Sequence, residues 1–417
     1  MTSMCESNER GAPQGAGCKP LGITAKSSAP LGLEVVQENR RQRFKLQGIA
    51  ADLLAQDAGK KLEKSGKKHV GDIHRTCNCM WTALSSDVEL MRSKEHGTGH
   101  VKNIATCGSV WACPVCTAKI QERRRLEIAE AMTKHYTDGG QVIMVTLTAP
   151  HYNHQSLDEL RAMQRDALKD LRQGGAYKRM LKDEQGFEGL IRALEVTVSK
   201  RNGWHLHTHE LWFVKGDADV ERIKQRTLER WEKACYKVGL LNPFDDKQVR
   251  AFRRRSVDIK ANASCSDYLA KMDESKHWGA DREIAKQSTK QGRKSGFHPF
   301  GLLVEVEQDG EHAKWAERRF IEYANGMKGA SQLFWSPGLK KKFEIGEKTD
   351  EELAAEEVDS LERIKTIDKS TWYSIARAGA RSTLLEVIEL QDSKALDAFV
   401  GAFEKIKSSA ERWRLRA

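Results

Sequence analysis

The sequence lacks the features that mark secreted proteins, membrane proteins and nucleotide-driven motors. Its first twenty residues contain no apolar segment like that of a signal peptide. The longest apolar-rich run, VIMVTLTA from Val142, is far too short to cross a bilayer. No Gly-x4-Gly-Lys-Ser/Thr phosphate-binding loop is present, since GEKT at Gly346 does not have that spacing. We therefore expect a cytoplasmic protein that contacts no membrane and does not use a nucleoside triphosphate to unwind nucleic acid.

Composition predicts a folded protein with a basic surface. The chain has 417 residues, which is room for two or three domains, and its 39% hydrophobic content is enough for compact cores. Its 70 Lys and Arg residues outnumber 59 Asp and Glu residues, which gives a formal charge of +11. This balance fits a polyanionic partner such as nucleic acid, although solubility alone also explains it.

Hydrophobic patterns divide the chain into four regions. Residues 1–36 are rich in Gly, Ser and Pro, and we expect them to be disordered. Residues 37–125 contain a helical lead-in and a cysteine-rich module. Residues 126–280 alternate between strands and helices, and residues 281–417 are mostly helical. No internal repeat is visible.

The strands of the third region predict the fold class. Apolar strands are expected at 141–149, 190–199 and 204–214, and a basic strand at 249–261. The second and third are joined by a tight hairpin turn, and helices separate the others. This order predicts an α+β fold with a central, mainly antiparallel sheet flanked by helices.

Three histidines alternate in the segment NGWHLHTHELWFV. Because side chains of a strand point to opposite faces in turn, His205, His207 and His209 share one face. One histidine there would be interpreted as a hydrogen-bonded core residue. Three imidazoles on one face instead favour a metal site, since buried imidazoles need partners.

The hairpin brings a carboxylate into this argument. A two-residue turn would set Glu195 opposite Glu210 and pair like charges. A three-residue loop at 201–203, with its glycine in the left-handed region, sets Glu195 opposite His209. We prefer that register, because one carboxylate with two imidazoles is a ligand set for Mg²⁺ or Mn²⁺. Whether Glu195 or His205 is the third ligand stays open.

Five of the nine cysteines lie close together and predict a second metal site. Cys113 and Cys116 have the two-residue spacing of a zinc knuckle. Cys107 and one of Cys77 or Cys79 would complete four thiolates around a structural zinc ion, with His74, His96 and His100 as competing ligands. The alternative is a set of reduced structural cysteines. The basic helix that follows, at 119–125, is either a contact for DNA backbone or a solvated face.

Several motifs together resemble one family. HLHTHELWFV resembles the metal-binding strand of HUH endonucleases, in particular the rolling-circle replication initiators (Rep proteins) of small plasmids and phages. GLIRALEVTVSKRNGWHLHTHEL and VTLTAP resemble two motifs of that family, and the likeness extends from Cys77 to Phe343. It implies an HUH nuclease fold whose metal pair is His207 and His209. Thr208 replaces the usual bulky residue between them, on the opposite face.

The same resemblance implies a nucleophile. DYLAKM is similar to the family's tyrosine motif, so Tyr268 would attack the scissile phosphate and Lys271, one turn later, would contact the phosphate or the leaving group. The expected products are a 5′-phosphotyrosine and a free 3′-OH primer, and the strand is rejoined at termination. Ser264 stands where relatives carry a glutamate or a second tyrosine, so the terminating residue stays open.

The resemblance also implies partners: plasmid or phage origin DNA that is single-stranded at the nick site, and a bacterial host's helicase, DNA polymerase and single-strand binding protein. The C-terminal region is interpreted either as an origin-recognition or host-contact module or as a helical cap. Two other functions remain alternatives. One is a zinc-containing DNA-binding regulator without nuclease activity, and the other is an HUH transposase or relaxase.

Overall fold

A computed structural model describes residues 33–65, 73–263, 297–356 and 360–414 of the chain. The predicted α+β fold with a mainly antiparallel sheet is confirmed: every strand pairing in this part of the chain is antiparallel. No helix within these ranges is long and apolar enough to cross a membrane. The expected disorder concerns mainly residues 1–32, outside the described residues, but residues 33–36 begin a helix instead.

The larger sheet has five strands in the order β6-β3-β5-β4-β7. Its middle strand is therefore the histidine strand, and β3, the predicted apolar strand, lies beside it in the interior of the sheet. The strands are β3 (Gly140–Thr148), β4 (Gly189–Ser199), β5 (Gly203–Lys215), β6 (Val257–Lys260) and β7 (Leu333–Trp335).

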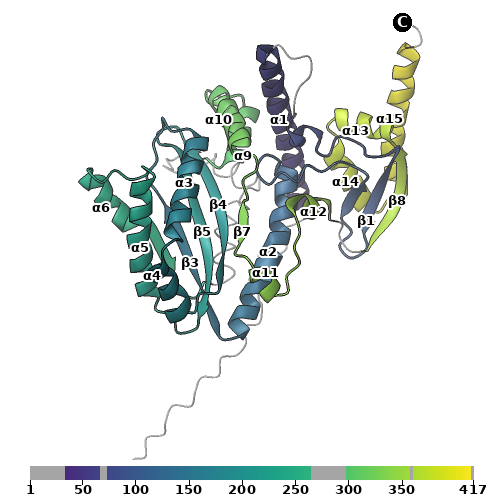
Figure 1. Cartoon of the computed structure of the whole chain (residues 1–417). Coiled ribbons are helices and arrows are strands. Elements are labelled where there is room, and N and C mark those ends of the chain that lie inside the picture. The colour runs from purple at the N-terminus through teal and green to yellow at the C-terminus, as the bar shows by residue number, and fades with distance from the viewer. Residues whose placement is uncertain (1–32, 66–72, 264–296, 357–359, 415–417) are drawn as a thin grey trace, which may run out of the picture.

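Helices cover both faces of this sheet (Figure 1). On one face, Leu211 and Phe213 of β5 pack with Ile128 and Met132 of the long helix α2. On the other face, the strands pack against α3 and α5. The helices around the sheet are α2 (Pro114–Thr137), α3 (Leu157–Leu171), α4 (Gly175–Arg179), η2 (Met180–Glu184), α5 (Val220–Lys237), α6 (Asp246–Arg255) and α11 (Leu339–Lys342).

The predicted basic strand at 249–261 is wrong over most of its length. Only its end forms β6, and residues 246–255 form helix α6. Asp245 accepts a hydrogen bond from the Gln248 backbone and caps this helix, and Val249 and Phe252, three residues apart, are its buried side chains. The arginines in its last turn favour the same outcome, because cations stabilise a helix C-terminus.

A smaller sheet joins segments that are far apart in the sequence. Its order is β2-β1-β8, so a strand of the C-terminal region pairs with one from the cysteine-rich module. Helices α13 to α15 pack around this sheet (Figure 1). The elements are η1 (Arg75–Asn78), β1 (Asp87–Ser93), β2 (Gly99–Lys102), α12 (Asp350–Ala355), β8 (Leu361–Asp368), α13 (Lys369–Arg377), α14 (Arg381–Glu389) and α15 (Ser393–Arg414).

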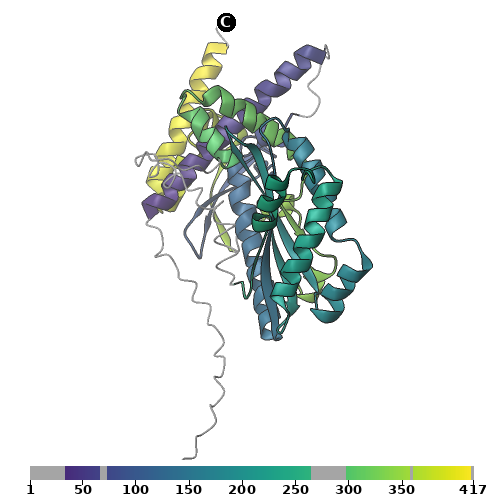
Figure 2. The ribbon, with the colours of Figure 1, turned by 90° about the vertical axis from the view of Figure 1, so that its left-hand side faces the viewer.

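Helix α1 (Leu33–Ser65) connects the two sheets. It runs across α9 (Pro299–Glu307) and α10 (Ala313–Gly326), as Figures 1 and 2 show, and also contacts α2, α14 and η1. Its buried residues Phe44, Ala50 and Leu54 belong to the same apolar core as strand residues of both sheets. This continuous core fixes the cysteine-rich module beside the larger sheet.

Candidate metal centres

The histidines lie where strand geometry predicts. On β5, His207 and His209 share the face of Leu211, which is the face that α2 covers. Thr208 and Glu210 lie on the opposite face, where both are fully buried. Glu210 is neutralised there by Arg172 and accepts a hydrogen bond from Trp212 Nε1 at 2.8 Å. The two faces of one strand therefore hold two different polar groups.

The predicted hairpin register is wrong by two residues. The loop has three residues, but they are 200–202, and Gly203 already pairs with Ser199. Gly203 has φ +74°, and a Cβ there would meet the Asn153 backbone at 2.7 Å, so a side chain would be excluded on both grounds. Glu195 consequently lies opposite His207 rather than His209. A shift of two residues keeps the face, so Glu195 still points to the histidines.

Glu195, His207 and His209 form one compact group. Oε2 of Glu195 lies 2.9 Å from Nε2 of His207 and 3.1 Å from Nε2 of His209. One ligand atom from each residue lies within 4.8 Å of the other two, and the three side chains are largely buried. Two imidazole nitrogens and a carboxylate oxygen that converge in this way can hold a divalent ion.

The surrounding groups fit this use. Nδ1 of His209 lies 3.0 Å from the Thr146 hydroxyl of β3, which fixes the ring and directs Nε2 toward Glu195. Nδ1 of His207 is buried without a hydrogen-bond partner among the described residues. The Thr146 contact at Nδ1 of His209 leaves both Nε2 atoms directed at the Glu195 carboxylate.

The pKa values of Glu195 and of the neighbouring His205 are both strongly lowered. Burial alone raises the pKa of Glu195, but hydrogen bonds and charge interactions with His207 and His209 outweigh it and hold that pKa well below its usual range. Burial, followed by the charge of His207, lowers the pKa of His205 to about 3. At neutral pH the group therefore combines an ionised carboxylate with a neutral imidazole beside it.

His205 lies next to the group but is not one of the three converging residues. Its Nε2 lies 3.0 Å from the Thr148 hydroxyl, and its ring stacks between His151 and His207. The predicted tyrosine and lysine, Tyr268 and Lys271, lie outside the described residues, as does Ser264. Their positions relative to the histidines stay predictions.

Four cysteines form the second group. Cys79, Cys107, Cys113 and Cys116 are buried and lie within 4.8 Å of one another. Three of the sulfur pairs, Cys79–Cys116, Cys107–Cys116 and Cys113–Cys79, are 3.4 to 3.6 Å apart, which is far longer than a disulfide bond of about 2 Å. The spacing is close to the roughly 3.8 Å expected for two thiolates that each lie about 2.3 Å from one tetrahedral zinc. The group can therefore hold a metal ion.

Cys77 is separated from these four, because its Sγ donates to the Ala51 carbonyl of α1 at 3.4 Å. Within the group, hydrogen bonds from the other three thiols hold the pKa of Cys116 well below its usual range, whereas burial raises the pKa of Cys113. The site concentrates thiolate charge on buried sulfur, which a cation would neutralise. His74, His96 and His100 are not in the group.

Sequence reasoning missed four contributors to these sites. Thr146 and Thr148 anchor His209 and His205, and the alternation of VTLTAP opposite the histidine strand was a usable signal. His298 is half-buried and borders the same small chamber as Glu195 and His209, yet the segment GFHPF carries no pattern that assigns it chemistry. Arg381, buried near the thiols, donates to the Met80 carbonyl at 2.8 Å.

Comparison with known proteins finds relatives of this chain in several bacteria. A protein named "Protein rep" from Streptomyces lividans is 26% identical over 366 residues, covering 73% of this chain and 80% of that protein. "Protein rep" from Lactiplantibacillus plantarum is 26% identical over 180 residues, covering 39% of this chain and 54% of that protein. "Neomycin resistance protein" from Streptomyces cyanogenus is 31% identical over 153 residues, covering 31% of this chain and 35% of that protein.

No solved structure matches this chain. The replication protein family, in contrast, matches residues 99–380, a range that contains the histidine group and three of the four clustered cysteines. The chain therefore belongs to the replication protein family, and its resemblance to plasmid Rep initiators is confirmed.

Proposed function

We propose that this replication protein starts rolling-circle replication as a metal-dependent, site-specific DNA endonuclease and strand transferase. The observation that carries the proposal is the convergence of Glu195, His207 and His209 on the middle strand and its neighbour. A zinc-containing regulator without nuclease activity explains the cysteine group but not the second group, which contains Glu195, His207 and His209.

The chain's own residues would hold and neutralise the reacting centre. Mg²⁺ or Mn²⁺, when held by this group, supplies Lewis-acid polarisation of a phosphate oxygen. Glu195 stays ionised because its pKa is low, so it can bind a cation at neutral pH without losing a proton. Thr146 keeps the His209 ring in place, and the stacked ring of His205 adds no charge beside the phosphate.

Tyr268 is the proposed nucleophile and Lys271 the proposed contact to the phosphate or leaving group. The Tyr268 oxygen forms a bond to phosphorus and loses its proton, while the bond from phosphorus to the 3′-oxygen breaks. That oxygen takes up a proton and becomes the free 3′-OH primer, and the 5′-phosphate stays on the tyrosine. The exchange of one phosphodiester for another preserves the energy that rejoining needs at termination.

In this proposal the four-cysteine group binds structural zinc. The substrate is plasmid or phage origin DNA, single-stranded at the nick, and a host helicase, polymerase and single-strand binding protein complete replication.

The test is formation of a covalent protein–DNA adduct on a labelled single-stranded origin oligonucleotide, with and without Mn²⁺. We expect an adduct that survives denaturing gels, needs the metal ion, and disappears in Tyr268→Phe while DNA binding persists. An adduct that persists in Tyr268→Phe contradicts the assigned nucleophile. Absence of metal-dependent nicking by the unaltered protein, together with indifference to His207→Ala, would favour the regulator.

A further inference from the structure

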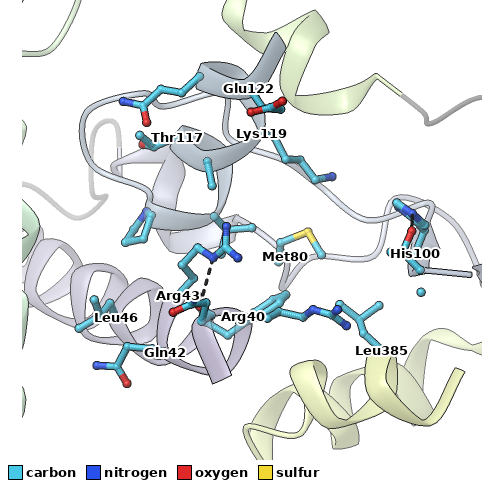
Figure 3. Close-up of a pocket in the computed structure, with 18 of the residues that line it drawn as sticks. Arg40, Gln42, Arg43, Leu46, Met80, His100, Thr117, Lys119, Glu122 and Leu385 are labelled. Atoms are coloured by element: carbon cyan, nitrogen blue, oxygen red, sulfur yellow. Dashed lines mark hydrogen bonds between the residues drawn. The ribbon is translucent and has the colours of Figure 1, made fainter. Parts of the chain in front are cut away.

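We propose that a cavity between α1 and the first turns of α2 binds an unpaired nucleotide of single-stranded DNA, at a site separate from the metal-binding residues. This inference rests on the proposed function only in taking DNA as the partner. The cavity has a volume of about 700 Å³ and lies at the junction of α1, α2, β2 and α14 (Figure 3). A volume of this size accommodates a ligand as large as a nucleotide.

The cavity carries an excess of positive charge. Four permanent cations line it, against two carboxylates: Arg40, Arg43, Lys119 and Arg123, against Glu122 and Glu356. Each of these carboxylates is also held at 2.6 Å by a basic residue that does not line the cavity, Glu122 by Arg125 and Glu356 by Lys348. The field inside the cavity is therefore positive, as a phosphate requires.

The basic residues face the cavity from opposite sides. In Figure 3, Arg43 points from α1 toward α2, and Lys119 extends from α2 into the same space. Lys119 has no carboxylate partner among the described residues, and Nε of Arg123 approaches Glu356 only to 3.7 Å. Arg40, by contrast, is held by Glu389 at 2.7 Å. Lys119 and Arg123, one helical turn apart, are thus the groups best able to exchange water for a phosphate.

Part of the cavity lining is apolar. Phe44, Met80, Leu353 and Leu385 line it and are each less than 10% exposed. A duplex turns phosphates and sugars outward and keeps the flat surfaces of its bases stacked inside. A lining that combines apolar side chains with cations instead suits an unpaired base, which gains from contact with aromatic and aliphatic side chains.

The cavity also adjoins the group formed by Glu195, His207 and His209. Thr117, Gln121 and Phe300 line both this cavity and the small chamber that Glu195 and His209 border. These three side chains form a shared wall between the two spaces. A single strand held at the metal group would therefore have a second, basic contact within reach on the same side of the sheet.

The experiment compares two charge-reversal variants of the full chain. Lys119→Glu with Arg123→Glu alters the cavity, and Lys178→Glu with Lys182→Glu is the control, with the same four-residue spacing at exposed positions. Binding is measured by fluorescence anisotropy with a single-stranded oligonucleotide, a duplex of the same sequence and a free deoxynucleoside monophosphate, over a range of salt concentrations. Origin nicking is measured in parallel.

We expect the cavity variant to lose at least tenfold in single-strand affinity. The slope of log affinity against log salt concentration should become shallower, by about one to two. The control should stay within twofold, and duplex affinity should change little. Photocrosslinking of a 4-thiothymidine oligonucleotide to the unaltered protein should label peptides from residues 38–46 or 114–123. Unchanged single-strand binding by the cavity variant overturns the proposal.

An equal loss on the duplex, or a free monophosphate that binds as tightly as the oligonucleotide, also overturns it, in favour of a duplex surface or a free-nucleotide site. Failure of the proposed function has a different signature, because the unaltered protein would then form no metal-dependent adduct, whatever the cavity variant binds.

Discussion

At the scale of single residues, the choice of the third metal ligand depends on where two side chains direct their polar atoms. Glu195 directs Oε2 at both His207 and His209, whereas His205 uses its Nε2 at the Thr148 hydroxyl. We expect His207→Ala to weaken Mn²⁺ binding by more than about 100-fold. That loss is larger than the one typical of residues that only hydrogen-bond to a metal ligand. His205→Ala should weaken it by less than about tenfold.

The measurement is Mn²⁺ titration followed by electron paramagnetic resonance, which needs no DNA and no nicking. Circular dichroism of both variants controls for folding. Equal losses of Mn²⁺ affinity in His205→Ala and His207→Ala would show that His205 is a ligand and would contradict the choice of Glu195 as the third ligand.

A second residue-scale prediction concerns pH. Nδ1 of His74 accepts a hydrogen bond from the Thr76 backbone as the N-cap of η1, so the ring must be neutral there. Burial, and then the charges of Lys328 and Arg75, lower the pKa of His74 from 6.5 to about 4. The unfolded chain therefore binds this proton at higher pH than the folded chain. The stability that His74 contributes is complete above about pH 6.5 and is lost as the pH falls toward 4.

The cost of protonating folded His74 is roughly 2 kcal/mol, after allowance for its partial exposure. His74→Asn keeps a capping acceptor but does not titrate. We expect its free energy of unfolding to fall less than that of the unaltered protein between pH 7 and pH 4.5, in urea titrations at both pH values. Identical pH dependence in the two proteins would contradict the prediction.

At the scale of elements, the period of a strand is what made the histidine site predictable. The predicted register was off by two residues, yet Glu195 was still placed on the correct face, because any even shift preserves it. The exact pairing could not be read from the sequence, since it depends on Gly203 pairing with Ser199 and on its close approach to Asn153. Helix α6 was missed because the signal that starts it, the capping residue Asp245, lies four residues before Val249, where the predicted strand began.

The cysteine-rich segment shows the same limit and gives a matched pair of variants. In CNCMW, spacing alone does not distinguish Cys77 from Cys79, and only the fold turns Cys77 toward α1. We expect Cys113→Ser to lose bound zinc and to lower the melting temperature, because the ion would no longer link four cysteine side chains. A serine hydroxyl can still cap α2, so the loss would not be a capping effect. Cys77→Ser should keep its zinc.

Zinc content per chain, by atomic absorption, and thermal unfolding by circular dichroism are the two readouts. Retention of a full equivalent of zinc by Cys113→Ser would exclude the four-cysteine site, and loss of zinc by Cys77→Ser would add Cys77 to it.

At the scale of the whole molecule, the C-terminal region and the segment around β1 depend on each other. Strand β8 pairs with β1 along its length, and Val88, Leu90, Ile367 and Trp372 are buried in one core. Trp372 Nε1 donates to the Trp81 carbonyl at 2.8 Å, two residues beyond Cys79. The C-terminal region therefore packs against the segment that follows Cys79, a contact that a division by sequence pattern at residue 281 does not anticipate.

Truncation after residue 356 tests this dependence. It removes β8 and α13 to α15, so β1 loses a neighbouring strand and the apolar side chains it buries against that layer become exposed. We expect the truncated chain to aggregate or to bind less than half an equivalent of zinc, measured by light scattering and atomic absorption. Truncation after Lys405, which removes only the end of α15, should keep both zinc and a single soluble species. A truncated chain that stays monomeric and binds a full equivalent of zinc would show instead that the cysteine group folds without the C-terminal layer, and that the pairing of β1 with β8 joins two independent units.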